Sequence, residues 1–162
     1  MISKKMEAAV NAQINAEQAS AHLYVAMSAY LESINWGGFA HWLRVQAKEE
    51  TGHSIRLYKH IVARGGVVTI DAIAAPPKKW KSVTEIFAQA YAHEQKITGM
   101  INDLVKLARS ENDYASEEAL MWFVKEQVEE EEQTLAIVNQ LEMIKENPMG
   151  LFQLNAILGK RE

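Results

Sequence analysis

The sequence predicts an all-α protein, a bundle of four long helices with one long crossover and a short fifth helix. Glycine and proline are confined to a few positions between long segments, and apolar residues inside those segments recur with helical spacing. Strand-like alternation is found only near Val67–Ile70. Pro148 suits the first turn of the fifth helix. The four long helices are expected over about 5–34, 38–64, 82–110 and 114–145.

Each long segment has its own evidence. Residues 1–36 contain neither glycine nor proline, Gly37-Gly38 separates the first two segments, and Ser82-Val-Thr-Glu85 has the pattern of a capping box that starts the third. The first and third segments carry their apolar residues at intervals of three, four and seven. These stripes are Val10, Ile14, Ala21, Tyr24, Met27 and Leu31, and Phe87, Ala90, Ile97, Ile101, Leu104 and Ala108.

The connection between the second and third helices is long enough to change the topology. A helix of about 27 residues spans roughly 40 Å, and a linker of about 16 residues reaches roughly 50 Å. These two helices can therefore run parallel, joined by a crossover along the whole bundle. The linker carries Val67, Val68, Ile70 and Ile73. Such an apolar loop either packs on its own bundle or meets another subunit.

Polar residues interrupt the apolar stripe of every long helix. The second stripe (Phe39, Leu43, Leu57, Ile61) and the fourth (Leu120, Phe123, Val138, Leu141) are broken in the same way as the first and third. Gln46 lies within the second stripe, and the residues that break the four stripes near mid-helix are Glu17; Glu50 and His53; Glu94; and Gln127 and Glu130. By helical angle alone Glu131 points inward as much as Glu130 does.

Buried carboxylates in such numbers require cations. Two carboxylates about 4 Å apart repel by roughly 4 kcal/mol even at an effective dielectric constant of 20. Two divalent metal ions supply four positive charges, which neutralise Glu17, Glu50, Glu94 and Glu130. Carboxylate and imidazole ligands without thiolate suit Fe(II), Mn(II) or Zn(II). Glu50 and His53, three residues apart, share one helix face. One Glu-x-x-His alone is usually a solvated face, so the prediction depends on all four helices together.

Composition excludes several other classes. The 162 residues suit one domain, 1–162, with a real core. The chain has 17 basic and 21 acidic residues, which disfavours binding to nucleic acid. It has no cysteine, which excludes disulfides and thiolate chemistry. No apolar stretch approaches the roughly 18 residues of a membrane helix, and the first residues lack the apolar core of a signal peptide. We expect a cytoplasmic protein with no membrane partner.

Four motifs make the chain similar to a known family. They are Ala16-Glu17 leading to Tyr24; Glu49-Glu50-Thr-Gly-His53; His93-Glu94; and Trp122 before Glu126-Gln127-Val-Glu129-Glu130. On these motifs, and over essentially its whole length, the chain resembles the ferritins, most of all the bacterial non-haem ferritins. Inward glutamates with a Glu-x-x-His pair are a known feature of ferritin-like di-iron proteins.

The resemblance implies a ferroxidase centre that oxidises Fe(II) with O2 or hydrogen peroxide. Glu17 and His53 would bind one iron, and Glu50 would bridge both. Glu94 and Glu130 would hold the second iron; the family register favours Glu130 over Glu131. Gln127 would face the second iron or its dioxygen side, and Tyr24 would lie beside the centre as a residue able to take part in redox chemistry. Glu49, Glu126 and Glu129 match the additional iron site of bacterial ferritins.

Departures from related families refine this expectation. Bacterioferritins and rubrerythrins repeat Glu-x-x-His on the last long helix, whereas here the motif reads Gln127-Val-Glu-Glu130, so the site is asymmetric. Bacterioferritins carry a haem-ligand methionine directly after the glutamate of the second helix; here that residue is Thr51, so no haem is expected. The tail from Pro148 to Leu158 would line the fourfold axes of a 24-subunit cage.

The leading hypothesis is therefore iron storage and detoxification, with ferric oxyhydroxide deposited in a hollow homo-oligomeric shell. A di-iron oxidase or peroxidase without storage is the alternative, distinguished by the iron retained per shell. A nucleoid-protecting mini-ferritin would place its ligands at a dimer interface, which the ligands inside this bundle argue against. A purely structural bundle leaves the buried carboxylates unexplained.

Overall fold

The computed structural model describes residues 1–145 and 147–162, and five helices account for its regular structure. The ends of the four long helices lie within one residue of those expected from the sequence, and the fifth helix begins at Pro148 as expected. No strand forms among the described residues, so the alternating segment 67–70 is irregular. The helices are α1 (Lys4–Ser33), α2 (Gly37–Ala63), α3 (Val83–Ser110), α4 (Tyr114–Ile144) and α5 (Pro148–Leu158).

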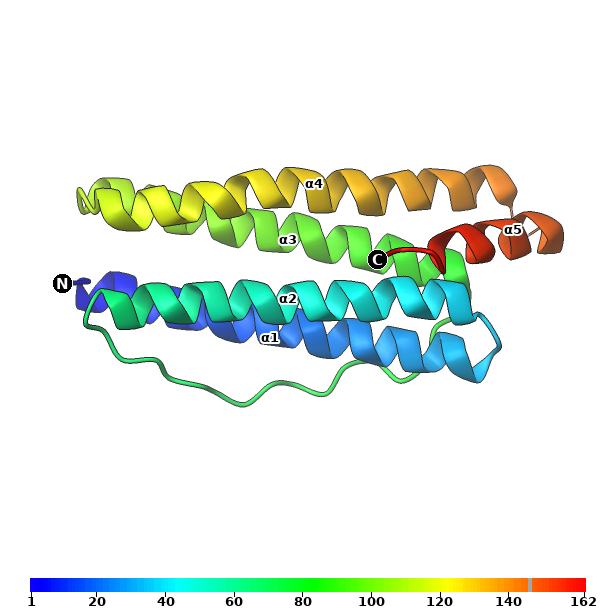
Figure 1. Cartoon of the computed structure of the whole chain (residues 1–162), viewed down its shortest axis with the longest axis horizontal. Helices are drawn as coiled ribbons and strands as arrows, with labels where there is room; N and C mark the ends of the chain where they lie inside the picture. Colours follow the sequence, from blue (N-terminus) through cyan, green and yellow to red (C-terminus); the bar gives the residue numbers. More distant parts are fainter. Residues whose placement is uncertain (146) are drawn as a thin grey trace.

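The topology is a four-helix bundle with one long crossover (Figure 1). α1 and α2 form one antiparallel pair and α3 and α4 form the other, while α5 lies across the end of the bundle where α2 begins. The segment between α2 and α3 runs the whole length of the bundle, so these two helices point the same way. The predicted crossover topology is confirmed.

Local side-chain caps explain where most helices begin. The Ser3 and Ser82 hydroxyls accept bonds from the backbone N–H groups of Met6 and Glu85, at 3.0 and 3.1 Å. Asp113 and Asn147 cap α4 and α5 in the same way. The first bond of the predicted capping box at Ser82 is present. In place of the second, the Glu85 carboxylate accepts a bond from the N–H of Lys81, the residue before the N-cap. These caps satisfy N–H groups that each helix leaves unpaired.

α2 is capped by a residue from the other end of the chain. Its own N-cap residue, Trp36, makes no side-chain cap bond. Instead the Asn155 side-chain oxygen accepts bonds from the N–H groups of Gly38 and Phe39, at 2.8 and 3.0 Å. A Cβ atom on Gly38 would lie 1.8 Å from the backbone oxygen of Asn155, which only a glycine avoids. This close approach fixes α5 on the start of α2.

The crossover is held against α1 through its backbone. The Asn11 amide donates to the carbonyl of Val67 and accepts from the N–H of Thr69, both at 2.9 Å. The Tyr30 hydroxyl donates to the carbonyl of Trp80 at 2.5 Å. Val68 packs on the core, whereas Val67 and Ile70 are more than 60% exposed on this single chain. Val68 therefore supports packing of the linker on its own bundle. The exposed Val67 and Ile70 leave room for contact with another subunit, which stays a prediction.

The apolar core consists of two clusters rather than one. One cluster includes Phe39 and Phe87, and the other includes Met6 and Leu104. Along every long helix the two clusters are separated by a short polar stretch. The neighbours on either side of this stretch are Ile14 and Tyr24, Ala47 and Leu57, Ala90 and Ile97, and Phe123 and Ile137. The interrupted stripes of the sequence thus form one polar layer across the middle of the bundle.

The contact between α5 and α2 gives a testable prediction. Gly38→Ala should lower the free energy of unfolding by about 1–3 kcal/mol, the usual cost of overpacking, because the new methyl group collides with the Asn155 backbone. Gly37→Ala is the matched control, since its Cβ would meet its nearest neighbour at an ordinary 3.8 Å. Thermal unfolding of both variants measures the effect. Equal stability of the two variants would contradict the close approach.

Candidate metal centre

The polar layer contains the seven residues expected at the paired metal site. All are buried, with exposed fractions of 4% or less. Glu131, the alternative to Glu130 by helical angle, is only half-buried. The layer therefore contains one carboxylate from each of the four long helices. The seven residues are Glu17, Tyr24, Glu50, His53, Glu94, Gln127 and Glu130.

Glu17, Glu50 and His53 form the first half of the site. One ligand atom from each lies within 4.8 Å of the other two. Gln13 donates to Glu17 Oε1 at 2.8 Å and Gln46 donates to Glu50 Oε1 at 3.3 Å, so each carboxylate has one oxygen held by an amide. The other oxygens, Glu17 Oε2 and Glu50 Oε2, and the His53 Nδ1 atom have no hydrogen-bond partner. His53 Nδ1 and Glu50 Oε2 lie 3.6 Å apart. Three buried ligand atoms without a hydrogen bond in one place are the arrangement that a cation satisfies.

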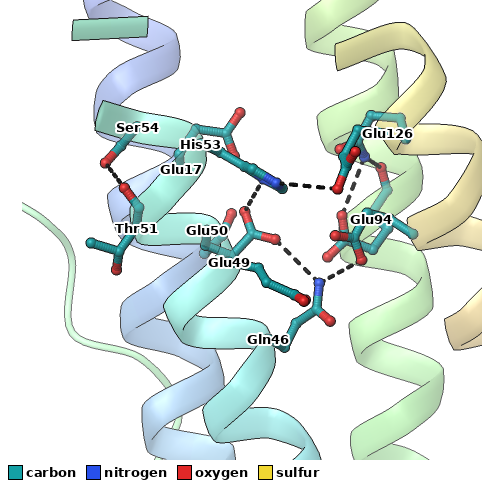
Figure 2. Close-up of polar contacts among 12 residues, drawn as sticks. Glu17, Gln46, Glu49, Glu50, Thr51, His53, Ser54, Glu94 and Glu126 are labelled. Atoms are coloured by element: carbon teal, nitrogen blue, oxygen red, sulfur yellow. Dashed lines mark hydrogen bonds and ion pairs between the residues drawn. The ribbon is translucent and has the colours of Figure 1, made fainter. Parts of the chain in front are cut away.

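Glu94 and Glu130, the residues expected to hold the second ion, lie in the same layer but do not form a ligand group with each other. Glu130 groups with His53 and Glu126, and among the described residues no group of three ligand atoms includes Glu94. The Tyr24 hydroxyl donates to Glu94 Oε1, and the Gln127 amide donates to Glu94 Oε2 at 3.2 Å. The Gln46 amide donates to Glu130 Oε2 at 2.5 Å. Figure 2 shows Gln46 below the layer, with its amide nitrogen bonded to Glu50 on one side and to one carboxylate of the far pair of helices, that of Glu130, on the other. These amide and hydroxyl donors favour the ionised forms of Glu94 and Glu130, against the larger effect of burial.

Glu126 reaches the same centre. Together with His53 and Glu130 it forms a second group whose ligand atoms lie within 4.8 Å of one another. Its Oε1 atom lies 3.7 Å from His53 Nε2, on the side of the ring away from Glu50 (Figure 2). The edge of the His53 ring packs against Trp122, with ring centroids 5.5 Å apart, which limits how the imidazole turns. His53 thus lies between Glu50, 3.6 Å from its Nδ1 atom, and Glu126, 3.7 Å from its Nε2 atom.

Glu49 and Glu129 lie farther out. The Glu49 side chain is 40% exposed and is paired with Arg161 at 2.5 Å, and Glu129 is exposed. In the described part of the chain, Glu49, Glu126 and Glu129 do not bring three ligand atoms to one point. Both Glu126 and Glu129 are nevertheless close enough to raise the pKa of Glu49 through charge repulsion, after burial as the main cause. A third iron site at Glu49, Glu126 and Glu129 stays a prediction from the sequence.

Burial and mutual repulsion raise the pKa values of the inner carboxyl groups. Burial, and then the charge of Glu50, raises the pKa of Glu17 well above its usual value. Burial and the charge of Glu94 do the same to Glu50, and they raise the pKa of Glu130 from 4.5 to about 7. Burial also raises the pKa of Glu94. Without metal the layer therefore holds protons that a cation would displace.

Three residues that contact the site were not assigned a role from the sequence. Gln46 was noted in the apolar stripe, and its four-residue spacing from Glu50 was the available signal. Gln13 stands at the same spacing before Glu17, the first carboxylate. No sequence pattern could have indicated the role of Arg161, because it is more than a hundred positions away from Gln46 and Glu49, which it contacts.

The fold and the site together define a ferritin-like bundle protein with a candidate carboxylate and histidine metal centre. The model of the ferritin family, described as a ferritin-like domain, matches residues 7–144. Bacterial non-heme ferritins of Bacteroides fragilis and Staphylococcus aureus are 38% and 37% identical over 161 residues. These alignments cover 99% of this chain and 100% and 97% of the relatives. The chain belongs to the ferritin family.

Solved structures of ferritins agree with this family assignment. An open pore ferritin from the hyperthermophilic archaeon Archaeoglobus fulgidus is 42% identical, with a TM-score of 0.99 and full coverage of both chains. An engineered closed form of that ferritin is equally similar, at 42% identity and a TM-score of 0.99, covering 100% of this chain and 99% of the other. Among the described residues, no helix has the length and apolar character needed to cross a bilayer.

The pKa of Glu130 gives a prediction for the metal-free protein. Between pH 4.5 and about 7 the folded state binds more protons at Glu130 than the unfolded state does, so the free energy of unfolding falls as pH rises through this window. The shift corresponds to roughly 3 kcal/mol between the two protonation states. Glu130→Gln should weaken this pH dependence and raise the melting temperature of the metal-free protein at pH 8.

Thermal unfolding from pH 4.5 to 8, with a chelator present, tests this prediction. The exposed Glu142→Gln is the matched control and should keep the wild-type pH dependence. If Glu130→Gln unfolds in parallel with wild type at every pH, the carboxyl group does not carry the predicted proton.

Proposed function

We propose that this chain is the ferroxidase subunit of an iron-storing ferritin. Fe(II) is the substrate, O2 or hydrogen peroxide is the oxidant, and ferric oxyhydroxide is the stored product. The observation that carries the proposal is the convergence of Glu17 Oε2, Glu50 Oε2 and His53 Nδ1, all buried and all without a hydrogen-bond partner. Hard oxygen ligands with one imidazole suit Fe(II), and family membership agrees with iron as the metal.

The inner carboxylates supply charge and exchange protons. Two Fe(II) ions bring four positive charges to Glu17, Glu50, Glu94 and Glu130, the four glutamates that are buried in the described part of the chain. Because burial raises the pKa values of these groups, binding the ions releases protons. Each Fe(II) then loses one electron, and O2 or peroxide accepts the pair. Glu50 bridges the two halves of the site, while Glu17 and His53 hold one ion and Glu94 and Glu130 hold the other.

Tyr24 and Gln127 act next to the reacting ions. Both donate to Glu94, so they fix the direction in which that carboxylate presents its oxygens. Burial and the charge of Glu94 raise the pKa of Tyr24 well above its usual value, which keeps its hydroxyl protonated. We propose that Gln127 limits the second ion to fewer protein ligands than the first, which leaves room for the oxidant.

We further propose that residues 1–162 act as one domain within a hollow homo-oligomeric shell of 24 subunits. Large apolar side chains remain exposed on the isolated chain: Met149, Phe152 and Ile157 on α5 and Val67 and Ile70 on the crossover are each more than 60% exposed. Exposed apolar patches mark protein interfaces. The Archaeoglobus fulgidus relatives are described as open pore and closed ferritins, which supports a pored shell. A cytoplasmic location stays a prediction from the sequence.

Removal of any paired-site ligand should abolish rapid iron oxidation. Glu17→Ala, Glu50→Ala and Glu94→Ala each delete a ligand in the polar layer and leave both apolar clusters intact, so the shell should still assemble. Stopped-flow absorbance of ferric product after aerobic Fe(II) addition, together with particle sizing, measures both. The exposed Glu142→Ala is the control. A ligand variant that oxidises its first two irons per chain at the wild-type rate would show that the centre is misassigned.

Iron retained per assembled particle separates storage from the alternative of a di-iron oxidase or peroxidase. A storing ferritin keeps far more iron than two or three ions per chain after repeated aerobic additions. Oxidation without retention would instead support an enzyme that does not store iron.

The outer carboxylates should affect turnover rather than the first reaction. Changing Glu49, Glu126 and Glu129 together to Ala removes the proposed third iron site but no ligand of the paired site. The first oxidation phase should stay nearly intact, while the iron oxidised per O2 and the recovery between additions should change. Stopped-flow absorbance measures the first phase and its recovery between additions, and an oxygen electrode measures the iron oxidised per O2. Unchanged stoichiometry and recovery would show an acidic face without a site, and loss of the first phase would show that these residues support the paired site directly.

A further inference from the structure

The segment after α5 places a partly buried arginine beside Gln46 and Glu49, at the edge of the candidate metal centre. The side chain of Arg161 is only 15% exposed, although it lies one residue from the C-terminus. Its guanidinium stacks on the Trp42 ring, 4.3 Å from the ring centroid, and its backbone oxygen lies 2.7 Å from His41 Nε2. It donates to the Trp42 carbonyl and to the Gln46, Glu49 and Gln133 side chains.

The bond to Gln46 fixes which way its amide points. Arginine has only donors, so the Gln46 oxygen must face the guanidinium, at 2.9 Å. The Gln46 NH2 group is thereby turned toward the polar layer, where it donates to Glu50 Oε1 and Glu130 Oε2. With its Oε1 held, Glu50 leaves its unpartnered Oε2 toward Glu17 and His53. If the Gln46 amide were reversed, its oxygen would face the carboxylate oxygens of Glu50 and Glu130, and these like partial charges would repel one another.

The bond to Glu49 has the opposite consequence for a cation. The guanidinium is 2.5 Å from Glu49 Oε2 and already neutralises this carboxylate. A metal ion that takes Glu49 as a ligand must displace this charge-assisted bond. Arg161 therefore favours metal at the paired site and competes with metal at the outer site.

We propose that Arg161 is a positioning residue of the metal centre, which sets the orientation of Glu50 and Glu130 through Gln46 and holds Glu49 until a cation takes that carboxylate. The inference depends on the proposed ferroxidase function, whose paired and outer sites it addresses. It also makes the docked C-terminal turn part of the centre, because that turn brings the guanidinium to Gln46.

A redox-inert probe, Zn²⁺, tests this inference by calorimetric titration of the assembled, metal-free protein. A Glu49→Gln background removes the outer ligand, so the titration reports the paired site. There Arg161→Gln should lower Zn²⁺ affinity about tenfold or more, the usual effect of losing a group that orients metal ligands. Gln46→Met should give a similar loss. Because Arg161 acts through Gln46, the double variant should lose no more than either single variant.

With Glu49 intact, the weakest Zn²⁺ site should instead bind several-fold more tightly in Arg161→Gln than in wild type. Arg161→Lys keeps a charge near Glu49 but loses the fork that reaches Gln46, so only its paired site should weaken. Lys160→Gln removes the same charge from the exposed neighbouring residue and should change neither affinity. Particle size and melting temperature establish that each variant is folded and assembled.

A structural role of Arg161 as a tail anchor would give no opposite change at the two sites. Equal Zn²⁺ affinities in Arg161→Gln and Lys160→Gln, or additive losses with Gln46→Met, would overturn the inference. Its failure is distinguishable from failure of the proposed function. If wild type oxidises Fe(II) but Arg161→Gln binds Zn²⁺ as wild type does, only the role of Arg161 is lost. Wild type that binds no Zn²⁺ pair and oxidises no Fe(II) would overturn the proposed function itself.

Discussion

The mutual repulsion of four buried glutamates is the constraint on which the rest of this structure depends. Glu17, Glu50, Glu94 and Glu130 come from four different helices and meet in one layer. Such a layer costs free energy unless protons, hydrogen-bond donors or cations compensate the charge. In the metal-free chain the compensation comes from protons and from donors such as Gln46 and Tyr24. The unpartnered atoms that remain are the ones a metal would use.

The apolar parts of the bundle provide the stability that this layer lacks. Burial of large side chains such as Phe39 and Phe87 on one side, and Met6 and Leu104 on the other, is favourable by the hydrophobic effect. The polar residues can therefore be arranged for metal chemistry rather than for folding. This division explains why the ligands lie near the middle of each helix, with both ends of the bundle apolar.

Much of this arrangement could be predicted from the sequence, because helical periodicity and buried charge are local patterns. The positions of Glu17, Glu50 and His53 on inward helix faces follow from spacing alone. The choice of Glu130 over Glu131 does not, since two adjacent residues differ by only 100° around a helix. Contacts such as Asn155 with Gly38 and Arg161 with Gln46 join residues more than a hundred positions apart, and no local pattern encodes them. The partial burial of the crossover also depends on which α1 side chains meet it, as Asn11 does.

The cap that Asn155 places on α2 also constrains the order in which the chain is completed. The first turn of α2 lies near the start of the sequence, yet the acceptor for its N–H groups lies 117 residues later. During synthesis this turn must wait, with its N–H groups bonded to water, until the segment that carries Asn155 has left the ribosome. A subunit cut short before α5 would have the complete set of paired carboxylates but an unfinished bundle end. The cap on α2 and the exposed apolar residues of α5, Met149, Phe152 and Ile157, thus lie at the same end of the bundle.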